Sequence, residues 1–401
     1  MPTLLHLGAG LLQLPAIRAA QSAGLRVVAT DRDPEAPGRH VADHVLRLAA
    51  DDTAGIMAAA EEIDDLVGLY AAGDHALPTL ARVTTRLGLP GPSIASLSTL
   101  LDKAAATEAW RKAGLATTYG RRVADIADAK AALAAMGAPA ILKPSASSGS
   151  RGVRSVTTAK EVEAAWPVAA AFGTVILLER QLIGRHIDVN ICLIEGEVLR
   201  CGLLDRHFTL PPLHVPIWGM QPAGLTDAQE DAIYALVAKG ALAVDLDQGP
   251  VKGDVVLTDD GPHLLEVSAR LHGDVSSSHV SPTALGWHPA LPWFHHLAGQ
   301  DWQPPERGPA RRLIGWRAVL NPQPGRFLRV EGIEAACDMS GILEVMVIRR
   351  NGQILPAGTD NRAVIAFVIG EGASPVQLKT RLSAAAGALR PVIASDAAMK
   401  V

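Results

Sequence analysis

The sequence predicts a chain of mixed α/β and α+β class that is divided into three domains, and three observations support this. Over 1–98, short apolar strands alternate with helical stretches, a pattern typical of a doubly wound parallel sheet. Over 99–305, a loop rich in Ser and Gly and two hairpin patterns indicate an α+β domain. After residue 305 the composition changes, and strand-like runs followed by a helix predict a small, β-rich α+β domain over 306–401.

The composition excludes several classes of protein. The 401 residues are 48% hydrophobic and 19% charged, a balance that opposes intrinsic disorder and allows a large core. The 37 Lys and Arg against 41 Asp and Glu give a net charge of −4, which argues against a nucleic-acid partner because general nucleic-acid binders carry a basic excess. The three cysteines form no CxxC pair, so we expect three buried thiols rather than structural zinc or a disulfide framework: Cys192, Cys201 and Cys337.

The chain shows no signal for a membrane. Its apolar N-terminus lacks a basic segment and is interrupted by Gly8, Gly10 and Pro15, which favours a strand, a turn and a helix over a signal peptide. No stretch approaches the roughly 18 uninterrupted apolar residues that indicate a membrane span. We therefore expect a cytoplasmic protein with no membrane partner.

The apolar pattern also predicts the individual elements in order. In the first domain these are strands at 3–7, 25–30 and 66–72, a helix at 12–23, and a Pro- and Gly-rich boundary at 87–93. In the second domain they are a helix at 99–113, strands at 119–123, 139–143, 153–156 and 175–178, a hairpin over 187–204 that turns at 195–196, an irregular stretch over 205–220, a helix at 226–243, and a hairpin over 251–270 that turns at 259–261. In the third domain they are strand-like runs at 312–320, 343–349 and 363–369 and a helix at 375–388.

Two polar features near strand ends receive a structural interpretation. Gly8 and Gly10 with Asp31 resemble part of a dinucleotide fingerprint, but Gln13 stands where the third glycine belongs, so a tight turn is favoured over an NAD site. Asp74 follows the third strand, and we expect it to cap a helix N-terminus. For His272, in a later loop, we favour a place near a substrate pocket over a zinc site.

A stronger candidate is the loop at 145–152, which follows Lys143 at the end of a predicted strand. Small residues let backbone N–H groups approach phosphate oxygens, hydroxyl groups add donors, and the lysine adds a fixed positive charge. The P-loop pattern GxxxxGK[ST] is absent from this loop. Taken alone, the loop is also compatible with a flexible surface turn.

The second hairpin carries alternating charges. Glu266 and Ser268 lie two residues apart and therefore share a face, and cross-strand pairing brings Asp254 to the same face. Carboxylates this close repel, so a cation is their natural partner, and hard oxygen ligands suit Mg²⁺ on a polyphosphate. Lys252 flanks this set and Arg270 extends it. A solvated hairpin with a salt bridge or two would explain one carboxylate but fits the whole alternating set poorly.

These motifs, in this order, resemble the ATP-grasp superfamily, in the branch with biotin carboxylase-like and carboxylate–amine ligase enzymes. The resemblance covers essentially the whole chain and rests on five segments. They are LHLGAGLLQLPAIRAAQSAGLRVVATDRDPEAPG, LDKAAATEAWRKAGL, ILKPSASSGSRGV, LLERQLIGRHIDVNI and GPVKGDVVLTDDGPHLLEVSARLHGD. The last two are the most specific.

The resemblance implies an ATP-grasp fold with a Rossmann-like pre-ATP-grasp domain over 1–98, an ATP-grasp domain over 99–305 whose small lid subdomain spans about 115–183, and a C-terminal α+β domain over 306–401. It also implies that ATP binds between the lid subdomain and the larger sheet near 184–300. The nucleotide-binding residues that it implies are Lys103, Lys143, Ser147, Ser148, Gly149, Ser150, Gly152, Glu179, Arg180, Leu182, His186 and Asp188. The implied metal ligands are Asp254, Glu266 and Ser268, and the implied catalytic residues are Lys252 and Arg270.

Two positions depart from the family pattern. His186 stands seven residues after Glu179, where the family often has an acid that bonds the ribose, and Asp188 is the candidate substitute. Ser268 stands where the E-x-N motif has Asn, so the number of Mg²⁺ ions stays open.

The implied reaction has two steps and uses ATP and Mg²⁺, with Mn²⁺ as an alternative metal. A small-molecule carboxylic acid attacks the γ-phosphate to give an acylphosphate and ADP, and a small-molecule amine then displaces phosphate to give an amide or peptide bond. Two alternatives stay open: a carboxylase that uses bicarbonate, although no biotin-accepting Met-Lys-Met segment occurs, and a non-catalytic nucleotide-binding module. The resemblance weakly implies a homodimer, and the identity of the acid and the amine is open.

Overall fold

The protein is described here by a computed structural model that covers residues 1–137, 139–304 and 312–394. The chain forms two compact units, each made of three segments. Unit 1 comprises Met1–Thr117, Ile187–Leu204 and Ala223–Arg311, and unit 2 comprises Thr118–His186, Asp205–Pro222 and Arg312–Val401. The predicted division into three domains stays a prediction, and its boundary at 305/306 lies outside the described residues.

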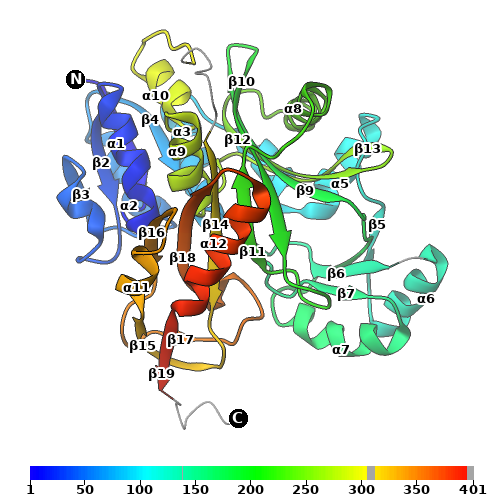
Figure 1. The fold of residues 1–401 in the computed structure, drawn as a ribbon. Helices are drawn as coiled ribbons and strands as arrows, with labels where there is room; N and C mark the ends of the chain where they lie inside the picture. The colour runs from blue at the N-terminus through cyan, green and yellow to red at the C-terminus, as the bar shows by residue number, and fades with distance from the viewer. Residues whose placement is uncertain (138, 305–311, 395–401) are drawn as a thin grey trace. The chain divides into compact units, whose positions relative to one another are not determined.

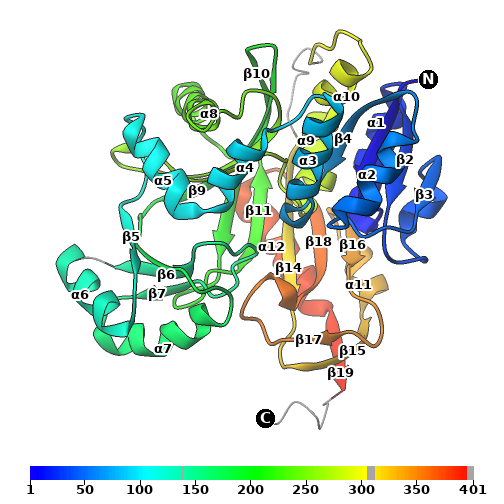
Figure 2. The same cartoon turned by 180° about the vertical axis from the view of Figure 1, so that it is seen from behind.

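Unit 1 begins with a four-stranded parallel sheet in the order β3-β2-β1-β4. Its strands are fully buried where they carry Leu4, Leu5 and Val27, as expected for a sheet covered on both faces. Figures 1 and 2, seen from opposite sides, show α1 on one face and α2 and α3 on the other. The elements are β1 (Thr3–Leu7), a 3-10 helix (Leu11–Gln13), α1 (Leu14–Ser22), β2 (Arg26–Thr30), a 3-10 helix (Pro37–His40), β3 (His44–Leu46), α2 (Thr53–Glu61), β4 (Leu66–Ala71), a 3-10 helix (Asp74–Ala76) and α3 (Leu77–Leu87). The predicted doubly wound sheet is confirmed.

The predicted helix over 99–113 is wrong in its extent, because two helices meet there. α4 (Ile94–Leu101) ends and α5 (Lys103–Lys112) begins around Asp102, whose backbone is extended. The Asp102 carboxylate accepts hydrogen bonds from the backbone N–H groups of Ala104 and Ala105 at 3.0 and 3.4 Å. Asp102 is therefore an N-cap, and this cap places Lys103 at the first position of α5.

The rest of unit 1 is built on two hairpins and a long helix. α8 packs against β13, and the indole N–H of Trp110 donates to the carbonyl of Gly240 at 2.9 Å. The elements are β9 (Arg185–Ile194) and β10 (Glu197–Phe208), which both extend into unit 2, α8 (Asp227–Leu242), β12 (Gly249–Thr258), β13 (Gly261–Ser268), a π-helix (Ser276–Val280), α9 (Ser281–Leu285) and α10 (Leu291–Leu297). Both predicted hairpins and the predicted helix over 226–243 are confirmed.

Unit 2 contains a small antiparallel sheet in the order β5-β8-β6-β7. α6 and α7 pack on it, and Leu142, Val162 and Leu178 form part of the core between them (Figure 1). The elements are β5 (Gly120–Val123), α6 (Ile126–Met136), β6 (Ala140–Pro144), β7 (Arg154–Val156), α7 (Ala159–Ala170) and β8 (Ile176–Arg180). The Ser- and Gly-rich loop joins β6 to β7, as predicted.

The remainder of unit 2 is an antiparallel sheet in which β11, β14, β18 and β16 follow the end of β10, with α12 packed on β14 and β18 (Figure 1). The predicted irregular stretch over 205–220 is wrong at its two ends, because Asp205 pairs with Met220 and both lie in strands. Residues 209–215 between these strands belong to no helix or strand. The elements are β11 (Pro216–Gln221), β14 (Leu313–Leu320), β15 (Gly325–Glu331), α11 (Ile333–Cys337), β16 (Ile342–Val347), β17 (Ile354–Leu355), a 3-10 helix (Asn361–Ala363), β18 (Val364–Gly372), α12 (Pro375–Ala388) and β19 (Arg390–Ala394).

The cysteines and the helices test two further expectations. Cys192 and Cys201 are buried, but Cys337 is exposed, so the expectation of three buried thiols is wrong at this position. Cys337 ends the short helix α11, whose buried residue is its neighbour Ala336. Within the described ranges, no helix combines the length and the apolar character needed to cross a membrane.

Candidate active site

The hairpin β12–β13 sets the geometry of the predicted metal and catalytic residues. Asp254 stands directly opposite Glu266 in the strand register, and Lys252 stands opposite Ser268. The register shifts just after Asp254. The predicted charged set therefore meets on the hairpin in unit 1.

An ammonium group connects the two carboxylates of this set. The Nζ of Lys252 lies 3.1 Å from Asp254 Oδ2 and 2.6 Å from Glu266 Oε1, and its side chain is 7% exposed. Lys103 Nζ lies 3.3 Å from the other oxygen of Glu266. Burial alone lowers the pKa of Lys252, but the charges of Asp254 and Glu266 raise it above the usual range. Burial likewise raises the pKa of Glu266, and Lys103 and Lys252 together bring it below its usual value.

Arg270 is held by a carboxylate from a distant part of the chain. Its Nε and Nη2 donate to Asp74 Oδ1 and Oδ2, both at 2.7 Å, and its Nη1 donates to the carbonyl of Leu271 at 2.9 Å. Ser268 Oγ also donates to Asp74 Oδ1 at 3.2 Å. Although burial raises the pKa of Asp74, the charge and hydrogen bonds of Arg270 hold it well below the usual range. A guanidinium fork that pairs with both carboxylate oxygens has a fixed orientation.

The expectation that Asp74 caps a helix is wrong. The 3-10 helix that begins at Asp74 has Gly73 as its N-cap, without a side-chain cap bond. The carboxylate instead takes the stronger, charge-assisted contact with Arg270. Asp74 is therefore a member of this site that the sequence did not reveal, because its partner lies 196 residues away along the chain.

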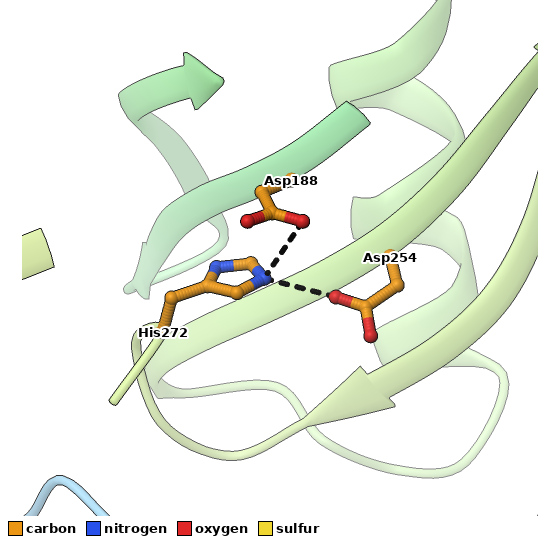
Figure 3. A group of neighbouring side chains, drawn as sticks. All are labelled: Asp188, Asp254 and His272. Carbon is orange, nitrogen blue, oxygen red and sulfur yellow. Dashed lines mark hydrogen bonds and ion pairs between the residues drawn. The ribbon is translucent and has the colours of Figure 1, made fainter. Parts of the chain in front are cut away.

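A histidine extends the cluster on the other side of Asp254. His272 Nε2 lies 2.9 Å from Asp254 Oδ1 and 3.5 Å from Asp188 Oδ1 (Figure 3). Asn190 Oδ1 lies 3.1 Å from His272 Nδ1. The sequence placed His272 near a substrate pocket and Asp188 at the ribose, so the association of these two side chains was missed. The alternation Asp188, Asn190 on β9 and Arg270, His272 after β13 was the available signal.

In unit 2, the predicted nucleotide residues centre on one ion pair. Lys143 Nζ lies 2.5 Å from Glu179 Oε2, and the two side chains are 12% and 7% exposed. β6 and β8 bring them together, because Ile141 pairs with Glu179 and Lys143 pairs with Leu177. The pair is thus held between adjacent strands.

The Ser- and Gly-rich loop has a defined backbone. Gly149, Ser150 and Gly152 have φ angles of 67°, 61° and 75°, in the left-handed region. A Cβ on Gly152 would lie 2.9 Å from Pro144 Cγ, so this position requires glycine for space as well as for conformation. Arg151 Nε donates to the carbonyl of Ser148 at 2.9 Å and closes the loop on itself.

The remaining predicted residues lie around this pair and this loop. Arg180 is exposed at the end of β8, and Leu182 follows it. The ring of His186 meets that of Phe208 edge to face, with centroids 4.8 Å apart. The predicted residues thus fall into a set in unit 1 and a set in unit 2. Unit 1 holds Lys103, Asp188, Lys252, Asp254, Glu266, Ser268 and Arg270, and unit 2 holds Lys143, Ser147, Ser148, Gly149, Ser150, Gly152, Glu179, Arg180, Leu182 and His186.

Comparison with known proteins agrees with the motifs. A family model described as carbamoyl-phosphate synthase L chain, ATP binding domain, matches residues 102–200, and one described as L-amino acid ligase C-terminal domain 2 matches residues 317–394. The chain is 30% identical over 300 residues to the formate-dependent phosphoribosylglycinamide formyltransferase of Dechloromonas aromatica, which covers 66% of this chain and 69% of the relative. The chain belongs to the ATP-grasp superfamily. Within it, the likenesses point to the branch of carboxylate–amine ligases and their relatives.

Two further proteins resemble this chain, one in its overall fold and one over part of its sequence. The structure of an L-amino acid ligase from Bacillus licheniformis superposes with a TM-score of 0.79 at 20% identity, over 98% of this chain and 99% of that one. This shows that the ATP-grasp chain shares that overall fold. A D-alanine–D-alanine ligase of Aromatoleum aromaticum is 30% identical over 187 residues, which is 44% of this chain. The chain spans 59% of the length of that relative.

Proposed function

We propose that this ATP-grasp protein is an ADP-forming ligase that activates a small-molecule carboxylate as an acylphosphate and joins it to an amine. The observation that carries the proposal is the partly buried ion network of unit 1, in which Lys252 contacts both Asp254 and Glu266 and Lys103 contacts Glu266. Such a site supplies fixed charges rather than a nucleophile. Phosphoryl transfer needs mainly positioning and charge stabilisation.

The donor set also fits Mg²⁺. The carboxylates of Asp254 and Glu266 face each other across the hairpin, and hard oxygen donors of this kind are the usual ligands of that ion. Asp254 and Glu266 would hold the metal, with Ser268 beside them. When bound, Mg²⁺ would neutralise phosphate charge. Lys252 already balances both carboxylates and would turn toward phosphate oxygens once the metal takes its place.

Arg270 suits the carboxylate substrate. A guanidinium has five N–H donors, and Asp74 and the carbonyl of Leu271 take three of them. The others would bind the substrate carboxylate and hold one of its oxygens in line with the γ-phosphorus. In the first step that oxygen forms a bond to phosphorus and the bond to ADP breaks. In the second step the amine nitrogen forms a bond to the acyl carbon, loses a proton, and inorganic phosphate leaves.

The residues of unit 2 would bind the nucleotide. Glu179, Arg180 and Leu182 would contact the adenine, and Lys143 would exchange its contact with Glu179 for phosphate oxygens. The loop has three residues in the left-handed region, a conformation that recurs in backbone segments whose N–H groups bind anions. Ser147 to Gly152 would cover the β- and γ-phosphates. A cytoplasmic location and a homodimer stay predictions.

The test is ADP release with Mg-ATP and a panel of amino acids and hydroxy acids, each with and without an added amine and with and without bicarbonate. We expect ADP release that requires an acid, trapping of the acylphosphate by hydroxylamine as a hydroxamate, and an amide product by mass spectrometry. Glu266→Gln should lower the rate at least tenfold, by analogy with the loss of other preorganised electrostatic groups. Lys130→Ala, in an exposed ion pair, is the control.

The other outcomes would each replace the proposal. ADP release that depends on bicarbonate and no organic acid would indicate a carboxylase. Nucleotide binding without ADP release on any acid would indicate a binding module. Equal rates for Glu266→Gln and wild type would remove the hairpin from the reaction.

A further inference from the structure

A histidine and two carboxylates meet at one point of unit 1. His272 Nε2 lies 2.9 Å from Asp254 Oδ1 and 3.5 Å from Asp188 Oδ1, and one ligand atom of each side chain lies within 4.8 Å of the other two. Figure 3 shows the imidazole edge directed at both carboxylates. His272 and Asp188 are each 4% exposed, whereas Asp254 is 34% exposed. The group is therefore buried and approachable from the side of Asp254.

The hydrogen bonds behind the ring determine which nitrogen carries its proton. Asn190 presents its amide oxygen to this ring, because that atom accepts the backbone N–H of His272 at 3.0 Å. The amide nitrogen of Asn190 donates to Ser277 Oγ at 3.1 Å, which fits the same orientation. Asn190 Oδ1 also lies 3.1 Å from His272 Nδ1 and can only accept, so Nδ1 bears a hydrogen.

Nε2 of His272 therefore faces two carboxylate oxygens and needs a cation between itself and them. The cation is either a second proton on the ring or a metal ion. Ligand atoms about 2.1 Å from one ion lie about 3.0 Å apart in an octahedron and about 3.4 Å apart in a tetrahedron. The separations of 2.9 and 3.5 Å from Nε2 to the two carboxylate oxygens are short enough for one ion to be held by all three side chains. A bound imidazole whose other N–H is fixed by an oxygen acceptor is the usual arrangement around protein metals.

We propose that Asp188, Asp254 and His272 bind a divalent transition-metal ion such as Mn²⁺. Imidazole nitrogen is a ligand for transition metals, whereas Mg²⁺ takes oxygen ligands, so this site should prefer Mn²⁺ to Mg²⁺. It differs from the Mg²⁺ site proposed above, which would use Asp254 and Glu266. Asp254 would take part in both, since its Oδ1 faces His272 and its Oδ2 faces Lys252. The proposal goes beyond the proposed reaction and requires no nucleotide.

The test is titration of the full-length, chelator-treated protein with MnCl₂ in the absence of nucleotide, followed by electron paramagnetic resonance. We expect one Mn²⁺ per chain with nitrogen couplings from an imidazole in the electron spin-echo spectrum. His272→Gln should remove those couplings, and both it and Asp188→Asn should weaken Mn²⁺ binding at least tenfold. His263→Gln replaces a histidine on β13 that lies outside the proposed site, and this variant should bind as wild type does. A hundredfold excess of Mg²⁺ should displace little Mn²⁺.

Glu266→Gln separates this site from the reaction. We expect that variant to keep the bound Mn²⁺ and the nitrogen couplings even where it loses turnover. Binding that depends on Glu266 and not on His272 would place the ion at the oxygen-only site and overturn the proposal.

Folding is checked by thermal unfolding of each variant with and without MnCl₂. Mn²⁺ should raise the unfolding temperature of wild type and of His263→Gln, and should not raise that of Asp188→Asn, because a ligand stabilises only the state that binds it. Wild type that binds no Mn²⁺ at millimolar concentration, or binds it without nitrogen couplings, would contradict the proposal.

Discussion

The two units hold their buried charges in different ways. In unit 1, Lys252 contacts both Asp254 and Glu266, and Arg270 contacts both oxygens of Asp74 and the carbonyl of Leu271. In unit 2, Lys143 and Glu179 form a single pair beside a loop. Strand register holds the charged groups in both units, but in unit 2 the strand that carries Lys143 leads directly into a loop with residues in the left-handed region.

This difference has a consequence for catalysis. Charges fixed by several mutual contacts need little reorganisation when phosphate charge develops, which is the condition for strong electrostatic stabilisation. A loop with few packed side chains pays its ordering entropy when a ligand arrives. We therefore expect substitutions in unit 1 to affect stability as well as activity, and substitutions in the loop region of unit 2 to affect mainly ligand binding and turnover.

The largest expected effect is that of Asp74→Ala on stability. Removal of this carboxylate leaves the guanidinium of Arg270 buried without its partner, which typically costs about 3–5 kcal/mol in the free energy of unfolding. Denaturant-induced unfolding measures it. The control is Glu163→Ala, which removes the exposed ion pair between Glu163 and Lys130 in unit 2. For this variant we expect a loss of about 0–1 kcal/mol in the free energy of unfolding. The double variant Asp74→Leu with Arg270→Met should be less destabilised than Asp74→Ala, because it leaves no unpaired charge. If Asp74→Ala loses no more stability than Glu163→Ala, the two units do not differ in how they hold charge.

The next effect is that of Lys143→Ala on turnover. The missing charge should remove about 2–4 kcal/mol of transition-state stabilisation, which is a loss of roughly 30- to 1,000-fold in kcat/KM. Steady-state ADP release measures this, with unfolding curves to show that the variant is folded in the assay. Lys143→Arg keeps the charge and should retain part of the activity. Unchanged activity with normal ATP affinity would remove Lys143 from the site.

A pH dependence follows from buried histidines of unit 1. Burial lowers the pKa of His6 from 6.5 to about 4 and that of His288 to about 3. Both rings are neutral in the fold, so the unfolded chain binds more protons below pH 6.5. The stability that each neutral ring contributes to the fold is complete above pH 6.5. It is lost as the pH falls toward 4 for His6 and toward 3 for His288, and the free energy of unfolding falls by up to about 1.4 kcal/mol per pH unit for each ring.

The measurement is the free energy of unfolding from pH 7 to pH 4.5 for wild type, His6→Gln and His288→Gln. Each variant should reduce the slope of stability against pH. Identical slopes in all three proteins would mean that neither ring is held neutral by burial.

The smallest effect concerns the loop of unit 2. Mg-ATP should slow tryptic cleavage after Arg151 several-fold, because phosphate contacts would order the loop. Peptide mapping over time measures the rate. Arg350, in the turn after β16 and in the same unit, is the control and should be cleaved at the same rate with and without nucleotide. Equal protection of both sites, or protection of neither, would contradict a phosphate lid at 145–152.

Much of the fold could be predicted because its signals are local. The turns at 195–196 and 259–261 end strands whose alternation is visible in the sequence, and Glu195 and Gly196 adopt left-handed conformations there. The predicted elements were wrong where a single capping residue or a strand partner distant in the sequence decides the structure. Asp102 interrupts a stretch that is otherwise helical in composition, and the two ends of the 205–220 segment are strands because Asp205 pairs with Met220.

The residues of the candidate site could also be predicted where they lie close together in the sequence. Alternation along β12 and β13 placed Lys252, Asp254, Glu266 and Ser268 on one hairpin, and the strand register agrees with it. The nucleotide, metal and catalytic roles of these residues stay predictions, which the substitutions above are designed to test.

By itself, the sequence determined most of the elements, the two hairpins and the faces that carry charge, because these depend on neighbours a few residues apart. Only the tertiary structure decided that Asp74 meets Arg270, 196 residues later, and that Asn190 orients His272, 82 residues later. The physical reason is that such contacts depend on strand order and on the packing of whole segments. The charge of a side chain restricts which partners are favourable, but the fold selects the one that lies within hydrogen-bond distance.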